Sequence, residues 1–101
     1  MAKALVVCGS GASSGFMASA ARKAAKKEGV GIEFKARSDS EIESYLSGMD
    51  LLLLAPHLKY MLSDVETEAQ KQNVRIAIIP QKIYGMLDGA GLVKFAKEQL
   101  E

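Results

Sequence analysis

The chain alternates short apolar runs with longer segments in which apolar residues recur at helical spacing. The runs that predict strands lie at residues 4–7, 32–37, 51–55 and 74–79. The segments that predict helices lie at residues 16–28, 42–49, 63–73 and 89–100. Strands that alternate with helices predict an α/β fold with a parallel sheet and right-handed crossover connections.

The same patterns assign the strands to places in the sheet. Residues 4–7 and 51–55 are apolar throughout, which is typical of strands with both faces covered. Residues 32–37 alternate apolar and charged positions, so one face is wet and this strand belongs at an edge. We therefore expect a three-layer sandwich in which a four-stranded parallel sheet, in the order 2-1-3-4, has helices on both faces.

Capping signals indicate where the helices begin. Ser38–Glu41 and Ser63–Glu66 both have the spacing of a capping box, so a helix is expected to start at each. Asp88 is placed to cap the final helix, and residues 84–89 are expected to form a turn.

A loop rich in glycine and serine, Cys8–Gly15, joins the first strand to the first helix. Glycine allows successive backbone N–H groups to point inward, and a helix start adds unpaired N–H groups and a partial positive charge. Such a loop suits phosphate and favours the thiolate form of the cysteine at its first position. We expect Cys8 to be the nucleophile that takes up a phosphoryl group, with phosphate contacts from Gly9, Ser10, Gly11, Ala12, Ser13, Ser14 and Gly15.

The expected topology places this loop at a ligand site. The strand order reverses between the first and third strands, and ligands of open sheets bind at the carboxyl ends of strands beside such a reversal. Residues 56–57 leave the sheet at the same edge. We therefore regard His57, the only histidine, and Tyr84 as possible rim residues.

The loop by itself leaves two alternatives open. A lone cysteine at the end of a buried strand often serves as a small hydrophobic residue. A glycine-rich turn after a first strand also occurs in nucleotide-binding domains, although this loop matches neither the G-x-G-x-x-G nor the G-x-x-x-x-G-K-[ST] pattern.

Composition narrows the classes of function. Among 101 residues, 13 Lys and Arg against 12 Asp and Glu give a net charge of +1. The chain thus lacks the excess of positive charge that is typical of nucleic-acid-binding domains. The single cysteine excludes an internal disulfide and a multi-cysteine metal site, and it suits a reducing cytosol. No apolar run reaches the roughly 20 residues that span a bilayer, and the first strand begins too early for a secretory signal. We expect one cytoplasmic domain, residues 1–101, with no metal and no cofactor.

Cysteine-dependent phosphatases also hold phosphate in a loop that begins with the nucleophile, and they place an arginine six positions later. Ser14 occupies that position here. The aspartates stand at positions 39, 50, 64 and 88, and none is followed by proline, the arrangement that small phosphatases use for their general acid. Such a loop can receive phosphate without readily hydrolysing it, as a relay requires.

Three motifs together resemble a known family: Cys8-x-x-Gly11-x-Ser13-Ser14, DLLLLAPHLKYM at 50–61 and YGMLDG at 84–89. In this order, over essentially the whole chain, they are similar to the enzyme IIB component of the bacterial phosphoenolpyruvate-dependent sugar phosphotransferase system, in its lactose/cellobiose (chitobiose) branch. The chain departs from the family pattern where His57 replaces the usual glutamine and where Gly15 replaces a frequent serine.

The resemblance implies a four-stranded parallel sheet with flanking helices, and a phosphotransferase that carries phosphate as phosphocysteine. Cys8 would accept phosphate from a histidine of the IIA component. It would pass the group to a disaccharide of cellobiose, chitobiose or lactose type bound by the membrane component IIC, during transient contact with the inner face of the membrane. The apolar neighbours Ala12, Phe16 and Met61 predict mostly apolar, transient docking.

Two other functions remain alternatives. A small cysteine-dependent phosphatase or arsenate reductase would use the same thiolate but needs the missing arginine. A flavodoxin-like binding module would use the same fold without chemistry at Cys8.

Overall fold

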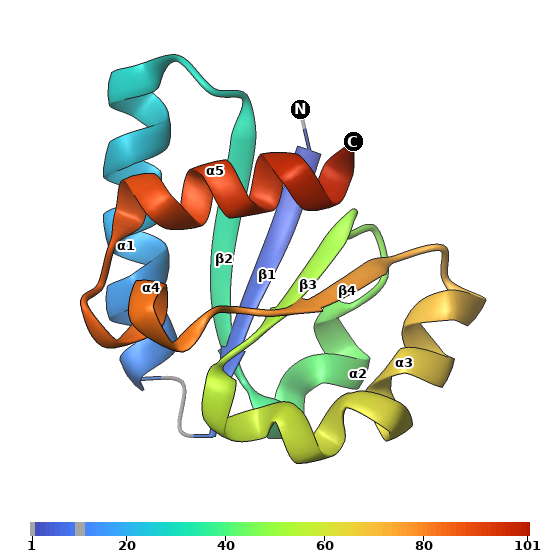
Figure 1. The fold of residues 1–101 in the computed structure, drawn as a ribbon. Helices are drawn as coiled ribbons and strands as arrows, with labels where there is room; N and C mark the ends of the chain where they lie inside the picture. Colours follow the sequence, from blue (N-terminus) through green and yellow to red (C-terminus); the bar gives the residue numbers. More distant parts are fainter. Residues whose placement is uncertain (1, 10–11) are drawn as a thin grey trace.

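The computed structural model of the chain describes residues 2–9 and 12–101, and it contains one sheet of four parallel strands. The strands are β1 (Ala2–Cys8), β2 (Ile32–Ser38), β3 (Leu51–Leu54) and β4 (Arg75–Ile78). Their order across the sheet is β2-β1-β3-β4, so the predicted order is confirmed (Figure 1).

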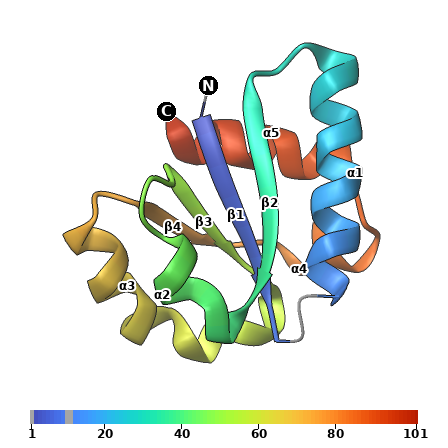
Figure 2. The ribbon, with the colours of Figure 1, turned by 180° about the vertical axis from the view of Figure 1, so that it is seen from behind.

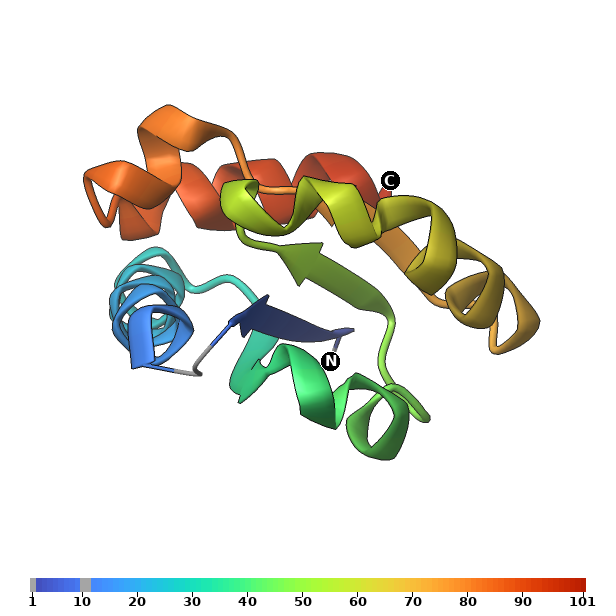
Figure 3. The same ribbon diagram turned by 90° about the horizontal axis from the view of Figure 1, so that it is seen from below.

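Helices cover both faces of this sheet. Figure 3 shows α1 (Ala12–Glu28), α4 (Gln81–Gly85) and α5 (Gly89–Leu100) on one side, and α2 (Ile42–Tyr45) and α3 (Leu62–Lys71) on the other. Two short 3-10 helices, η1 (Asp39–Glu41) and η2 (Pro56–Met61), lead from the sheet into α2 and α3. The expected three-layer sandwich is therefore confirmed.

Each face of the sheet has its own apolar core. Ala4 and Val6 of β1 belong to the core beneath α1 and α5, whereas Leu5 and Val7 belong to the core beneath α2 and α3. All four residues are completely buried, because a strand with helices on both faces has no wet side. The continuous apolar run at 4–7 thus correctly predicted a central strand.

The predicted edge strand is also confirmed. Figure 2 shows β2 at the end of the sheet, with α1 beyond it. Phe34 is buried against α1, while its neighbours Glu33 and Lys35 are exposed. Arg22 of α1 donates from Nε to the carbonyl oxygen of Phe34 over 2.8 Å, which ties the helix to this edge.

The packing of α1 against α5 depends on one glycine. A Cβ atom at Gly89 would collide with the backbone carbonyl of Ala20 in α1. The close approach of these two helices therefore requires the absence of a side chain at the first residue of α5.

Several element boundaries differ from those predicted. α1 begins at Ala12 rather than at residue 16, so the second half of the expected loop is helical. Residues 84–89 were expected to form a turn, but α4 extends to Gly85 and places Tyr84 on a helix. Both stretches are too short or too rich in Gly and Ser for apolar periodicity to reveal a helix.

The two capping boxes have different outcomes. The carboxylate of Glu41 accepts hydrogen bonds from the backbone N–H and the hydroxyl of Ser38, at 3.1 and 3.0 Å, and the first box is present. The second prediction is wrong, because α3 begins at Leu62 and its N-cap, Met61, makes no side-chain cap. The preceding 3-10 helix η2 runs directly into α3, so Ser63 is already helical and has no helix start to cap. Asp88 caps α5 as expected, accepting from the N–H of Gly91 at 2.9 Å.

No helix in residues 2–9 and 12–101 is both long enough and apolar enough to cross a membrane.

Candidate active site

Cys8 is the last residue of β1, at the carboxyl edge of the sheet. In the register it lies opposite Ser38 of β2, and the residue before it pairs with Leu54 of β3. Cys8 is thus flanked by both neighbouring strands at the place where the strand order reverses, and only 1% of its surface is exposed. The reactive end of β1 lies where ligands bind in open α/β sheets.

The first turn of α1 faces this sulfur. The backbone N–H of Ser14 donates to Cys8 Sγ across 3.2 Å, and Ser14 is completely buried. The hydroxyl of Ser14 donates to the carbonyl oxygen of Arg37 at 3.3 Å, which fixes the helix start against β2. An N–H group of a helix N-terminus pointing at sulfur favours the thiolate over the thiol.

The remaining loop residues take different places. Gly9 follows β1 in a bend, whereas Ala12, Ser13, Ser14 and Gly15 all belong to the first turn of α1. Ser10, Gly11 and the side chain of Ala12 lie outside what the structure describes. The segment between strand and helix is therefore shorter than the eight-residue loop that the sequence suggested.

Tyr84 reaches the site from α4, although it lies 71 residues along the chain from Ser13. Its hydroxyl and Ser13 Oγ share a hydrogen bond of 2.6 Å. Burial is the largest influence on the pKa of Tyr84 and raises it, whereas the hydrogen bond with Ser13 lowers it. Cys8 raises this pKa as well, both through its charge and through a hydrogen bond with the tyrosine hydroxyl. The net effect is a pKa above the ordinary value of tyrosine, so at neutral pH the hydroxyl keeps its proton and can donate it in a hydrogen bond to a thiolate.

His57 lies at the outer side of this group. It is exposed, in η2 directly after β3, and its ring meets the ring of Tyr84 edge-on, with centroids 6.1 Å apart and an interplanar angle of 68°. The structure therefore brings together the two residues that the sequence suggested as a rim, although they come from different segments.

Arg37 is a cation near the site that sequence reasoning did not consider. It precedes Ser38 in β2, its guanidinium lies 4.2 Å from the centre of the Tyr45 ring, and it donates to the carbonyl of Ala36 at 2.7 Å. Its charged group is thus engaged with α2 and its own strand, a cation–π contact that no spacing in the sequence reveals.

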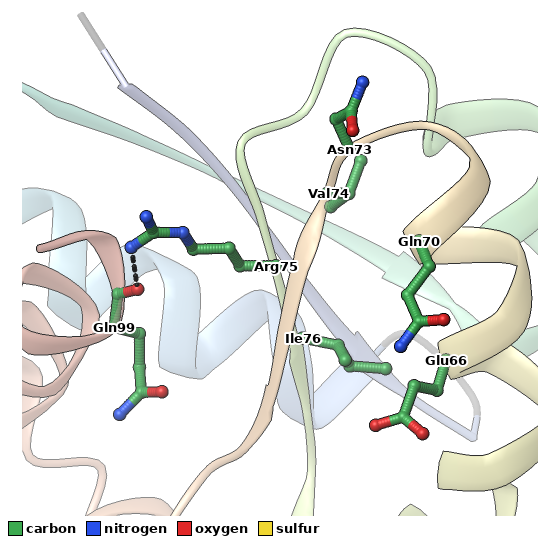
Figure 4. Close-up of a pocket in the computed structure, with 7 residues that line it drawn as sticks. All are labelled: Glu66, Gln70, Asn73, Val74, Arg75, Ile76 and Gln99. Atoms are coloured by element: carbon green, nitrogen blue, oxygen red, sulfur yellow. Dashed lines mark hydrogen bonds between the residues drawn. The ribbon is translucent and has the colours of Figure 1, made fainter.

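The larger of the two described pockets is elsewhere. It has a volume of about 530 Å³ and lies beside the first residues of β4 (Figure 4). In the parallel register these residues are at the end of the sheet opposite to Cys8. Arg75, on its wall, donates to the carbonyl oxygens of Gln99 and Glu101 at 2.7 and 2.8 Å and so holds the end of α5. The pocket is remote from the cysteine and plays no part in the site.

The geometry around Tyr84 leads to a prediction. Tyr84→Phe removes a hydrogen-bond donor that favours the thiolate of Cys8, so we expect the pH at which half of the thiol is alkylated by iodoacetamide to rise. A hydrogen bond to a charged group is worth about 1.5–3 kcal/mol, which corresponds to about one to two pH units. Tyr60→Phe, at an exposed tyrosine of η2, is the control and should leave the profile unchanged. Identical profiles for all three proteins would contradict this role of Tyr84.

Comparison with known proteins identifies the family. Residues 3–95 match the family described as "PTS system, Lactose/Cellobiose specific IIB subunit". The chain belongs to this IIB family. It is therefore a phosphotransferase component with a role in sugar phosphotransfer.

Several relatives share this IIB domain. The chain is 32% identical, over 89 residues, to the galactose-specific EIIB component of Lactococcus lactis subsp. cremoris, covering 83% of this chain and 82% of the relative. It is 27% identical to the oligo-beta-mannoside-specific EIIB component of Bacillus subtilis, covering 88% and 86%. It also matches the lactose-specific EIICB component of Streptococcus mutans at 31% identity, over 96% of this chain but only 17% of that longer protein.

A solved structure has the same fold. The lactose-specific IIB domain of Streptococcus pneumoniae superposes with a TM-score of 0.90 at 20% identity, covering 99% of this chain and 98% of that one. A backbone can stay the same at such low identity, since cores tolerate many apolar substitutions when their total volume and patterning are kept.

Proposed function

We propose that this chain is a phosphoryl carrier that works as a single IIB domain in the cytoplasm. Cys8 accepts phosphate from the phosphohistidine of a IIA component and passes it to a disaccharide of cellobiose, chitobiose or lactose type bound by the membrane component IIC. The observation that supports this most directly is the N–H of Ser14, at the start of α1, pointing at Cys8 Sγ from 3.2 Å.

The first transfer needs a thiolate in line with the donor. The sulfur attacks phosphorus, the S–P bond forms, the N–P bond of the phosphohistidine breaks, and the imidazole leaves with the electron pair of that bond. Backbone N–H groups of the connection after β1 and of the first turn of α1, for which we propose residues 9–15, hold the equatorial oxygens during this exchange. The Ser13 hydroxyl, hydrogen-bonded to Tyr84, holds the Tyr84 hydroxyl beside the sulfur.

The second transfer reverses the role of sulfur. A hydroxyl of the bound sugar attacks phosphorus, the S–P bond breaks, and Cys8 leaves as a thiolate. The proton of the sugar hydroxyl passes to a base of the membrane component. The hydrogen bonds from Ser14 N–H and from Tyr84 stabilise the leaving thiolate, which lowers the barrier without any group that activates water.

The surroundings of Cys8 favour a carrier over a phosphatase. Ser14 stands where a phosphatase has its arginine, and the guanidinium of Arg37 is stacked on Tyr45. Asp88 caps α5, and Asp50 accepts from the N–H of Lys3 at 2.7 Å at the opposite end of the sheet. Two of the four aspartates thus already accept structural hydrogen bonds.

The surface around the carboxyl edge of the sheet is apolar and suits docking. Phe16 in α1, Tyr60 in η2 and Met86 after α4 are 67–73% exposed, and all three segments border the carboxyl edge of the sheet. A small apolar contact suits partners that must bind and release quickly. Met61 is half-buried against α2 and α3, so of the two expected apolar neighbours whose side chains the structure describes, Phe16 is the more exposed.

A phosphorylation assay tests the proposal. With IIA and labelled phosphoenolpyruvate-derived phosphate, the protein should take up one phosphoryl group, at Cys8, and keep it until membranes with IIC and sugar are added. We also expect negligible turnover of aryl phosphates, because losing even one transition-state contact typically costs on the order of 10²–10³ in rate. Rapid multiple-turnover release of inorganic phosphate by the isolated protein would instead establish the phosphatase alternative.

A further inference from the structure

Helices α2 and α3 lie on the face of the sheet opposite to α1 and α5 (Figures 2 and 3). Side chains of η1, α2 and α3, together with Met61, line a groove on this face. It has a volume of about 310 Å³. Its apolar floor consists of Ile42 and Val65, which are buried, and Met61, which is half-buried. The floor is continuous with the core beneath these helices, so the groove has a fixed shape rather than a loose surface.

The rim of this groove is acidic. Asp39 and Glu43 border it on one side, and Asp64 and Glu68 on the other, and the described lining contains no Lys or Arg. The opposite helical layer has the reverse charge, with the basic stretch 22–27 on the outside of α1. The nearly neutral chain is therefore polarised across the sheet, with the negative side at the groove.

The groove begins beside the active site. Ser38 lies opposite Cys8 in the register, and Asp39, the next residue, is on the rim. On the other side, η2 leaves β3 at the same edge and ends at Met61 on the floor. A partner that presents a phosphate donor or acceptor to Cys8 can therefore reach into the groove with the same surface.

We propose that this groove receives a cytoplasmic loop of the membrane component IIC that carries Lys or Arg around an apolar residue. Short cytoplasmic loops of membrane proteins are enriched in Lys and Arg, which complement the four carboxylates, while the apolar residue covers the floor. In the relatives named EIICB, the IIB region is part of a longer protein whose name includes IIC. This inference rests on the proposed function, since it names the surface that meets the acceptor.

The groove gives the carrier a way to tell its partners apart. Both partners must approach the apolar surface around Cys8. Only a partner with basic residues at the right place is also attracted by the carboxylates of the groove. Charge complementarity mainly raises the rate of encounter and suppresses wrong partners, and it weakens as salt rises. We therefore expect transfer to sugar to depend more steeply on ionic strength than phosphorylation by IIA.

A charge-reversal pair tests this surface. The variant Glu43→Lys/Asp64→Lys changes two exposed rim residues that are not part of the chemistry, and Glu33→Lys/Glu98→Lys makes the same change in charge on the edge strand β2 and on α5. We measure phosphorylation by IIA, phosphate transfer to sugar with membranes containing IIC, and co-sedimentation with those membranes against membranes that lack IIC. Thermal unfolding shows that each variant is folded.

We expect the groove variant to be phosphorylated at the normal rate, to transfer to sugar about tenfold or more slowly, and to lose its salt-sensitive co-sedimentation with membranes containing IIC. The control variant should behave as the unmodified protein. Normal transfer and normal sedimentation by the groove variant would overturn the inference, as would a defect confined to the IIA step, which would make the groove a docking site for the donor. Failure of the unmodified protein to become phosphorylated would count against the proposed function, whereas the sedimentation measurement would still decide on the groove.

Discussion

Cys8→Ser should reduce phosphate uptake from IIA to below detection while the protein remains folded. A serine hydroxyl fits the space of the thiol, but its proton is far harder to remove, and the N–H of Ser14 can stabilise an alkoxide too little to compensate. Loss of a nucleophile in other enzymes costs on the order of 10⁶ in rate. Mass spectrometry of the intact protein after incubation with phosphorylated IIA measures the effect.

The control for this experiment is Ser13→Ala, which keeps the sulfur and removes one hydroxyl from the hydrogen bond with Tyr84. We expect this variant to be phosphorylated more slowly but to the same extent. Phosphate found on His57 in either protein would contradict the assignment of Cys8 as the carrier. His57 is the alternative to check because it is exposed and its ring meets Tyr84.

Gly89→Ala should strongly destabilise the protein. Alanine favours a helix over glycine by about 1 kcal/mol, but the added Cβ would collide with the backbone carbonyl of Ala20, which a packed helix cannot move. Overpacking of this kind typically costs about 1–3 kcal/mol, and the clash with backbone places this site at the upper end or beyond. For a domain of this size, each kcal/mol lowers Tm by roughly 4–8 °C.

Gly31→Ala is the matched control. Nothing lies within 4 Å of a Cβ placed there, and the residue has no left-handed φ. Its substitution should leave stability unchanged or raise it by about 0.4–1 kcal/mol through the unfolded state. Thermal and urea unfolding of both variants give the comparison, and equal stability of Gly89→Ala and the unmodified protein would show that α1 and α5 can separate without cost.

The sheet was predictable because its pattern is local. The apolar run at 4–7 and the run of leucines at 51–54 are buried on both faces, and only central strands are. The alternation at 32–37 has one wet face, which only an edge strand has. The order β2-β1-β3-β4 follows from these two facts and the handedness of crossovers, and it places Cys8 at the carboxyl edge.

The helical elements were less predictable where tertiary contacts override local preference. Ala12–Gly15 is rich in serine and glycine, residues that favour loops over helix interiors. In the folded chain this stretch is the first turn of α1, with Ser14 bound through its N–H to Cys8 and through its hydroxyl to β2. The spacing at Ser63 likewise suggested a helix start. In the structure the 3-10 helix η2 continues directly into α3 at Leu62, so Ser63 already lies within a helix.

The sequence by itself thus determined the fold class, the strand order and the position of Cys8, since burial patterns along single elements are sufficient for these. Only the tertiary structure decided which residues surround the sulfur: Tyr84 meets Ser13 across 71 positions, His57 packs against Tyr84, and the guanidinium of Arg37 turns to Tyr45. Only it decided that the acids of α2 and α3 line one groove. The physical reason is that periodicity records which face of an element is buried, whereas a site made by several loops depends on how the packing of helices on the sheet aligns their ends.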